Sequence, residues 1–312
     1  MASLIALFMA SALPGATSAT VASLPPDTDF LDQLTSHTHL PLIPFTPVTS
    51  PDQGGTALPP GERAALSERI EALEAAPGVE FGIAVQDLRT GTTFSHKAEQ
   101  RFPTASVAKL TVLTMLLMRA DEEDRDLTSG ERAQSEQMIR YSDNDVTDGL
   151  YGRMGFNEGF LRHAENLGFT RTEPNPTGVW GSTMTTPADQ IRLLRALYTG
   201  EGPLSDGDRA YVRELMESVA PEQVWGVSAA AEPEDTVGLK NGWTPRDNNR
   251  GLWTVNSVGY VSGTDREYLV AVFSDHNPDY STGLELLEEM VAEVTEAMEA
   301  PGEHDDSTVP TR

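Results

Sequence analysis

Hydrophobic positions along the chain recur either about every 3.6 residues, as in a helix, or every second residue, as in a strand. A change from one spacing to the other marks the start of a new expected element. Apolar residues at helical spacing in 62–76 and again in 282–298 predict two amphipathic helices. Alternating or continuous apolar runs bounded by turn residues predict strands. These runs occupy residues 79–88, 92–97, 236–240, 251–261 and 266–274. The first two runs flank an Arg-Thr-Gly turn, so we expect them to form a hairpin.

The stretch from Ala105 to about Met216 has mainly helical patterns, broken by turns and one long loop. Strands near both ends with helices between them predict an α+β fold with three layers, α/β/α. A single antiparallel sheet would be assembled from both ends of the chain and packed with helices. An all-helical subdomain would be inserted between its halves.

The two ends of the chain have a different composition from this region. Residues 1–22 contain a short apolar run followed by small residues, which is typical of an export signal and predicts a secreted or cell-envelope protein. Residues 23–60 are rich in proline and threonine and predict a linker. Residues 300–312 form a polar tail. The folded domain is therefore expected at 61–299.

Charge and cysteine content exclude several classes of function. The chain has 22 Lys and Arg against 48 Asp and Glu, a net charge of −26, which argues against nucleic acid or anionic membrane as a partner. It has no cysteine, which excludes thiol nucleophiles and, on the same reasoning, a lipoprotein anchor. The histidines are scattered and no His-Glu-x-x-His occurs, so we expect neither a metal nor another cofactor. A monomer is the default expectation.

One of only three lysines follows a serine by three positions at the head of an apolar helical run. Ser106 and Lys109 would share a helix face, with Ser106 in the first turn, where backbone N–H groups are free to stabilise an oxyanion. A buried lysine can lose its proton and act as a base for the serine, which an arginine cannot. A chance pair, or a lysine that extends along the core to reach water, would give the same spacing.

Two further motifs lie downstream. Ser142-Asp143-Asn144 stands between two helical runs, and it could equally be an N-cap formed by Asp143 or Asn144. Lys240-Asn241-Gly242-Trp243 ends a strand, where glycine allows close approach of a ligand, although an ordinary strand-to-turn junction looks the same.

Together and in this order, the three motifs resemble the signature of the penicillin-recognising serine enzymes, most closely the class A β-lactamases. The resemblance covers nearly all of residues 61–299. It implies that Ser106 attacks a carbonyl and carries the acyl group, while Lys109 takes its proton. Ser142 would relay a proton to the departing nitrogen, and Asn144 would hold the amide side chain of the substrate.

The resemblance also implies a set of substrate contacts on the last motif and beyond it. Lys240 would attract the substrate carboxylate and tune Ser142, while the backbone N–H of Trp243 would complete the oxyanion hole. Asn241 and Gly242 would line the substrate site. The run "NNRGLW" looks like the strand that supplies a carboxylate-binding arginine in the family, which makes Arg250 the candidate.

Glu173-Pro174 matches the glutamate-proline pair with which class A enzymes activate the hydrolytic water. A carboxylate buried near Lys109 could act as that general base, whereas a surface glutamate in a turn is the alternative. The chain departs from the family pattern nearby: Asn175 stands in place of leucine, and it could substitute for the asparagine that normally follows and helps to hold the water. Asn241 replaces a threonine or serine, and only about 35 residues separate Ser106 from Ser142.

The sequence thus predicts a serine hydrolase that forms an acyl-enzyme with a β-lactam or a related amide. A peptidoglycan D,D-peptidase would share the three motifs without needing Glu173. A non-catalytic binding or sensor module on the same fold is the third reading. An ordinary esterase is disfavoured, because no Gly-x-Ser-x-Gly occurs.

Overall fold

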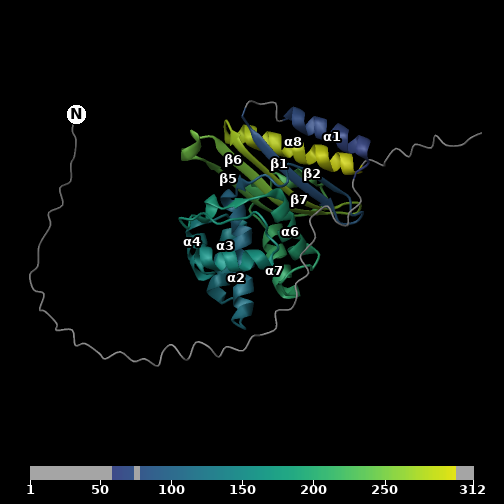
Figure 1. Ribbon diagram of the computed structural model, residues 1–312. Coiled ribbons are helices and arrows are strands. Elements are labelled where there is room, and N and C mark those ends of the chain that lie inside the picture. Colours follow the sequence, from purple (N-terminus) through teal and green to yellow (C-terminus); the bar gives the residue numbers. More distant parts are fainter. Residues whose placement is uncertain (1–57, 74–77, 300–312) are drawn as a thin grey trace, which may run out of the picture. The chain divides into compact units, whose positions relative to one another are not determined.

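A five-stranded antiparallel sheet forms the middle layer of the protein (Figure 1). The computed structural model describes residues 58–73 and 78–299, all within one compact unit. The strand order is β2-β1-β7-β6-β5. The strands are β1 (Glu80–Asp87), β2 (Thr93–His96), β5 (Thr236–Pro245), β6 (Trp253–Ser262) and β7 (Glu267–Asn277). The sheet therefore joins strands from both ends of the domain, as the sequence predicted.

Helices cover both faces of this sheet. On one face lie α1 (Pro60–Leu73) and α8 (Tyr280–Glu299), drawn in blue and yellow in Figure 1. The other helices of the described region pack on the opposite face. They are α2 (Ala108–Glu122), α3 (Ser129–Arg140), α4 (Asn144–Arg153), α5 (Phe156–Asn166), α6 (Pro187–Tyr198) and α7 (Asp206–Glu217). The predicted α+β fold with three layers and an inserted helical part is confirmed.

Alternation along the strands divides the apolar side chains between two cores. In β7, Val270 and Val272 face α1 and α8, whereas Leu269, Ala271 and Phe273 face the helical insertion. Because successive side chains of a strand point to opposite faces, a run that is apolar at every position can serve both cores. This explains why the pattern in 266–274 is continuous rather than alternating.

Two short features were not predicted from the sequence. Phe102–Pro103 (β3) pairs with Met184–Thr185 (β4) in a small second sheet. A 3₁₀ turn, Ala105–Val107, then precedes α2. The small sheet fastens the chain just before Ser106 to the end of the long loop between α5 and α6.

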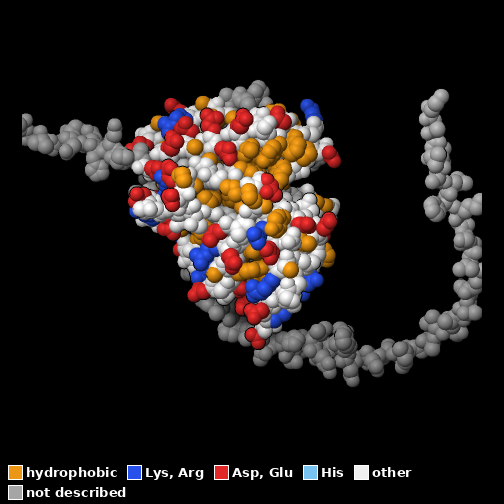
Figure 2. All heavy atoms as spheres, turned by 180° about the vertical axis from the view of Figure 1, so that it is seen from behind, with side chains coloured by type: hydrophobic (Ala, Val, Ile, Leu, Met, Phe, Trp, Pro, Cys, Tyr) orange, Lys and Arg blue, Asp and Glu red, His pale blue; other side chains and the backbone are white. Residues whose placement is uncertain are grey.

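The predictions for the two chain ends fall largely outside the described residues. The expected export signal, the tail and nearly all of the linker belong to that part, so they stay predictions. No described helix combines the length and apolar character needed to cross a bilayer. Acidic side chains are spread over the face shown in Figure 2 rather than gathered in one patch.

Candidate active site

Ser106 lies in the turn between β3 and α2, and its position is tightly constrained. Ala105, just before it, has a left-handed backbone with φ of 45°, a conformation that costs energy and is concentrated at functional sites. Gly242 of β5 lies so close that a Cβ there would come within 2.7 Å of the backbone nitrogens of both Ser106 and Val107. A glycine is therefore required at position 242, and β5 is held directly against the start of α2.

Lys109 begins the buried face of α2, and its side chain is fully buried. Its Nζ donates to the backbone oxygen of Ser142 at 2.5 Å, to Ser142 Oγ at 3.1 Å and to Asn144 Oδ1 at 2.7 Å. These three acceptors match the three N–H bonds of an ammonium group. Lys109 is therefore connected to the Ser142 motif, as the order of the motifs predicted.

Within the described residues, no hydrogen bond joins Ser106 Oγ to the Lys109 amine. The two residues nevertheless lie within one turn of each other at the N-terminal end of α2. Catalytic hydrogen bonds are commonly long in unliganded enzymes and form only when substrate is bound. In this structure, the amine would have to release one of its three acceptors to reach Ser106.

Burial lowers the pKa of Lys109 from 10.5 to about 8, while the nearby carboxylates of Asp143 and Asp148 act in the opposite direction. Removing a charged amine from water favours its neutral form, whereas a neighbouring negative charge favours the ammonium. The desolvation effect is the larger one. Lys109 can therefore carry a lone pair at mildly alkaline pH, which is the property that a base for Ser106 needs.

Ser142 is held between two amines. Lys240 is also buried, and its Nζ donates to Ser142 Oγ at 3.1 Å, the same distance as Lys109 Nζ. Burial and the positive charge of Lys109 lower the pKa of Lys240 well below its usual value. A hydroxyl that contacts two amines of lowered pKa can pass a proton in either direction, which suits the relay expected of Ser142.

The loop that carries Ser142 and Asn144 has the local structure that its sequence predicts. Asp143 is the N-cap of α4, and its carboxylate accepts a hydrogen bond from the Val146 backbone N–H at 3.1 Å. The helix therefore begins at Asn144, which exposes this side chain while its Oδ1 contacts Lys109. Ser142 has a left-handed φ of 57°. The capping interpretation and the catalytic one are thus compatible.

Strand β5 places its alternate residues on opposite faces of the sheet. Lys240 and Gly242 face the Ser106 turn. Asn241 faces the other way: it is buried, its Nδ2 donates to the backbone oxygen of Gln223 at 2.7 Å, and its Oδ1 accepts from Ser257 at 2.6 Å. Asn241 was expected to line the substrate site together with Gly242, but its amide is hydrogen-bonded inside the protein on the opposite side of the strand.

The ring of Trp243 also lies away from the Ser106 turn. It packs against Trp225 and Tyr280, with ring centroids 5.6 and 6.1 Å away. The bulky side chain therefore does not fill the site, and only its backbone N–H remains available for the expected role in an oxyanion hole.

Glu173 lies elsewhere than the sequence comparison suggested. Its side chain is 63% exposed, and its carboxylate pairs with Arg101 at 2.7 Å. A water-activating base beside Lys109 would have to be buried, so this placement differs from the expectation. Asn175, the suggested substitute for the water-holding asparagine, uses its Oδ1 to accept from the Thr177 backbone N–H at 2.9 Å. The Asn175 side chain is therefore used within a local turn of the loop, and within the described residues neither Glu173 nor Asn175 forms a hydrogen bond with Lys109.

Arg250 was expected on a strand beside Lys240 and lies instead in the turn between β5 and β6. It is exposed and has a left-handed φ of 57° at the end of a short 3₁₀ segment. The residues of β6 opposite Asn241 and Gly242 are Ser257 and Asn256. The strand at this register therefore lacks an arginine, and the basic side chains that the structure places around Ser142 are those of Lys109 and Lys240.

Two residues that the sequence analysis missed complete the surroundings of Lys109. The ring centroid of Trp180 lies 5.0 Å from Lys109 Nζ, and the indole N–H of Trp180 donates to Asp148 Oδ1 at 2.7 Å. Asp148 comes one helical turn after Asn144, so its proximity to the site could have been inferred from spacing. Trp180 had no such signal, because its position depends on the path of the loop.

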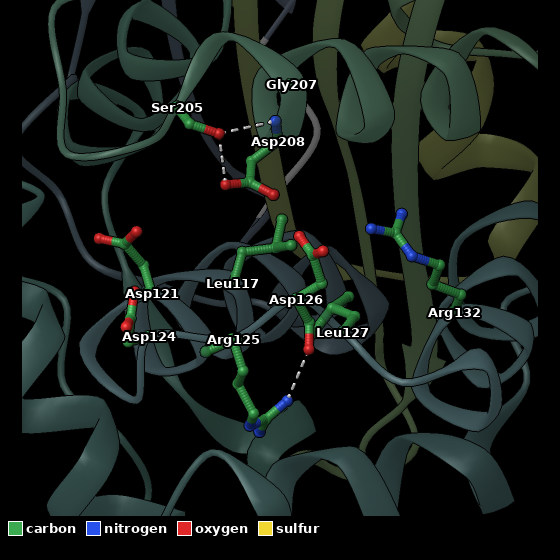
Figure 3. Close-up of a pocket in the computed structure, with 11 residues that line it drawn as sticks. Leu117, Asp121, Asp124, Arg125, Asp126, Leu127, Arg132, Ser205, Gly207 and Asp208 are labelled. Carbon is green, nitrogen blue, oxygen red and sulfur yellow. Dashed lines mark hydrogen bonds between the residues drawn. The ribbon is translucent and has the colours of Figure 1, made fainter.

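A cavity of about 450 Å³ lies at the other end of α2 (Figure 3). It is lined by side chains such as Asp121, Asp124, Asp126 and Arg132, and by Asp208 of α7. Asp208 accepts a hydrogen bond from Ser205. Since α2 rises about 1.5 Å per residue, this hollow is well separated from Ser106 and contributes nothing to the chemistry described above.

Comparison with known families agrees with this arrangement. A family model described as "Beta-lactamase enzyme family" matches residues 65–136 and 131–298. The chain belongs to this beta-lactamase enzyme family. In fold, the protein is similar to TLA-1 extended spectrum β-lactamase, with a TM-score of 0.67 and 15% identity over 77% of this chain and all of that one. It is also similar to PBP-A, with a TM-score of 0.66 and 20% identity over 80% of this chain and 99% of that one.

Curated relatives correct one expectation from the sequence. Proteins of Mycobacterium tuberculosis and Mycobacterium bovis named "Putative lipoprotein LppW" are 29% identical to the chain over 247 residues, covering 77% of this chain and 75% of theirs. Their name contradicts the expectation that the protein is not a lipoprotein. That expectation depended on the lack of cysteine alone, which is too weak a ground to exclude a class of protein.

Proposed function

We propose that the protein is a serine hydrolase that forms a covalent acyl-enzyme on Ser106 and hydrolyses β-lactams or related amides. The observation that carries this proposal is the buried Lys109 amine, which is hydrogen-bonded to Ser142 and whose pKa is lowered to about 8. Such an amine is chemically active near neutral pH, whereas an ordinary surface lysine is not.

In the acylation step, neutral Lys109 would accept the proton of Ser106 Oγ as that oxygen attacks the amide carbonyl carbon. The C–N bond would break, and its nitrogen would take a proton from Ser142, which Lys109 or Lys240 resupplies. The developing oxyanion would accept from the backbone N–H groups of Ser106 and Trp243. Gly242 supports this role, because it holds β5 against the Ser106 turn.

Substrate binding would use the remaining groups around the cleft. Within the described residues, the Asn144 amide nitrogen has no hydrogen-bond partner, so it can donate to the carbonyl of a substrate amide. Lys240 would attract a carboxylate, the group that β-lactams and peptidoglycan stem peptides have in common.

A second candidate function, a peptidoglycan D,D-peptidase, is favoured by one specific observation. The Glu173 carboxylate is exposed and paired with Arg101 rather than buried near Lys109. A peptidase does not need this glutamate, and a β-lactam would then acylate it as a slowly released substrate analogue. The fold similarity to PBP-A is compatible with this candidate without deciding it.

The test is to incubate the domain with fluorescent penicillin and benzylpenicillin and to follow gel labelling and intact mass. We expect a covalent adduct on wild-type protein and none on Ser106→Ala, since the nucleophile is lost. Rapid disappearance of the adduct with release of penicilloate identifies a β-lactamase. A persistent adduct together with release of D-alanine from a stem-peptide substrate identifies the peptidase. Absence of any adduct on folded wild-type protein would contradict both and favour a non-catalytic module.

A further inference from the structure

The turn Trp180–Ser182 is fixed directly against the turn that carries Ser106. The Thr104 backbone N–H donates to the Thr183 oxygen at 2.9 Å, and β3 and β4 pair immediately beside it. Thr104 Oγ1 also lies 3.5 Å from the Gly181 oxygen. The position of Trp180 relative to Ser106 is therefore set by backbone pairing of the residues just before the nucleophile.

The indole of Trp180 is held between two polar groups. One face of the ring lies over the Lys109 amine, with 5.0 Å from the centroid to Nζ. Its N–H donates to the carboxylate of Asp148 on α4 at 2.7 Å, and a hydrogen bond to a charged acceptor is among the stronger kinds. The ring also packs against the apolar core of the helical insertion. This combination orients the ring and not merely the loop.

Hydrolysis of an ester on Ser106 needs a water molecule next to the acyl carbonyl carbon. In that step, water adds to the acyl carbonyl carbon, the bond from this carbon to Ser106 Oγ breaks, and Oγ recovers a proton as the acid leaves. Beside the Lys109 amine, the structure has an aromatic ring, while the Glu173 carboxylate lies exposed and paired with Arg101.

We propose that Trp180, held in place by Asp148, is a hydrophobic wall that keeps water from the Lys109 side of the acyl-serine and so prolongs the life of the acyl-enzyme. Trp180 would act by excluding water and not by reacting with the substrate, so it is not a catalytic residue. The inference rests on the proposed function, because it requires an ester on Ser106.

The experiment measures two rates separately, the rate of labelling by fluorescent penicillin and the half-life of the purified adduct. We expect Trp180→Ala to shorten the half-life at least tenfold, with the labelling rate within about threefold of wild type. A variant that merely disturbed the fold would slow labelling and lower the melting temperature, which sets the two causes apart.

Asp148 offers a matched pair of variants. Asp148→Asn keeps an oxygen that can accept from the indole and removes only the charge, whereas Asp148→Ala removes the acceptor itself. We expect the half-life of the alanine variant to be about threefold shorter and that of the asparagine variant to stay within twofold of wild type. Val179→Ala, a change at the exposed neighbour of Trp180, is the control within the loop and should leave the half-life unchanged.

The outcomes separate the two proposals. Failure of wild-type protein to be labelled overturns the proposed function. Labelling of both proteins with equal half-lives in wild type and Trp180→Ala overturns the wall alone. Should Trp180→Ala not fold, Asp148→Ala decides, and an unchanged half-life in that variant overturns the inference.

Discussion

On one side of the candidate site, the amines of Lys109 and Lys240 are buried and both contact Ser142 Oγ. In the loop between α5 and α6, by contrast, the Glu173 carboxylate is exposed and pairs with Arg101. We call the first set, Lys109, Ser142 and Lys240, the amine side, and residues 167–186 the loop side. Both sides were predicted from the same family resemblance.

The difference teaches which chemical step the architecture supports. Burial shifts the pKa of a group and makes it reactive, while an exposed ion pair is screened by water and contributes about 0–1 kcal/mol at most. The amine side therefore has the means to activate a serine. The loop side offers an aromatic ring and an exposed carboxylate paired with Arg101, in place of the buried carboxylate that a water-activating base was expected to be.

Replacing Lys109 would break the amine side, and we expect the largest effect there. Lys109→Ala removes the base, and Lys109→Arg keeps a charge that cannot be given up, so both should slow acylation by about 10²–10⁴. The measurement is the second-order rate constant for labelling by fluorescent penicillin. An arginine variant that retained wild-type acylation would show that proton transfer to Lys109 is not required.

Gly242→Ala tests how closely the amine side must approach the nucleophile. The new Cβ would lie 2.6 Å from the Thr104 oxygen and 2.7 Å from the Ser106 nitrogen, so β5 or the Ser106 turn has to move. A displacement on the order of 1 Å can reduce a rate by roughly 10²-fold, and we expect that loss in acylation.

Gly149→Ala is the matched control for this change. A Cβ at Gly149, on α4, meets nothing within 4 Å, so acylation should be unaffected. Equal acylation rates in both glycine variants would contradict the close approach seen here.

The pH dependence of acylation sharpens the comparison. The pKa of Lys109 is lowered to about 8, so the amine is protonated and inactive as a base below that pH and neutral above it. The rate constant should therefore rise by about tenfold per pH unit between pH 6 and 7.5 and level off above about pH 8.5. Labelling rates in buffers from pH 6 to 10 give the profile. A rate that still rose steadily to pH 10 would indicate a lysine with its ordinary pKa.

Glu173→Gln tests the loop side, and the expected effect is the smallest. The carboxylate is 63% exposed, so its loss should change the half-life of the acyl-enzyme by less than about twofold. Arg101→Ala, which removes the partner instead, should behave alike. Intact mass after incubation with benzylpenicillin is the measurement. Strong accumulation of adduct in Glu173→Gln alone would show that the glutamate does activate water.

The sequence predicted those features that depend on local pattern. The hairpin, the three later strands and the closing helix follow from hydrophobic period, and the placement of Ser106 and Lys109 within one turn of each other follows from their spacing. Asp143 as an N-cap follows from residue preference. The contact between Lys109 and Ser142 depended on the order of the motifs in a resembling family, and the structure places them together.

Features that depend on chain path were not predictable in this way. Successive side chains of a strand point to opposite faces of the sheet. Once Lys240 is placed in the site, Asn241 could therefore have been predicted to face away from it. The exposure of Glu173 and the position of Trp180 depend on how a loop of this length closes onto β3, which motif matching does not report. Arg250 lies in the turn because β5 continues to Pro245, beyond the predicted end at Lys240, and β6 begins only at Trp253, after the predicted start at Gly251.

The sheet draws β1 and β2 from the beginning of the domain and β5, β6 and β7 from its end. Ser106 is synthesised long before Lys240, yet the pocket that activates it exists only once β5 has docked beside the start of α2. A nascent or proteolysed chain that ends before Thr236 would contain Ser106 but would lack Lys240 and Gly242 of β5. A covalent inhibitor should consequently label only molecules that are complete and folded. The labelled fraction would then measure the fraction of the protein that has completed folding.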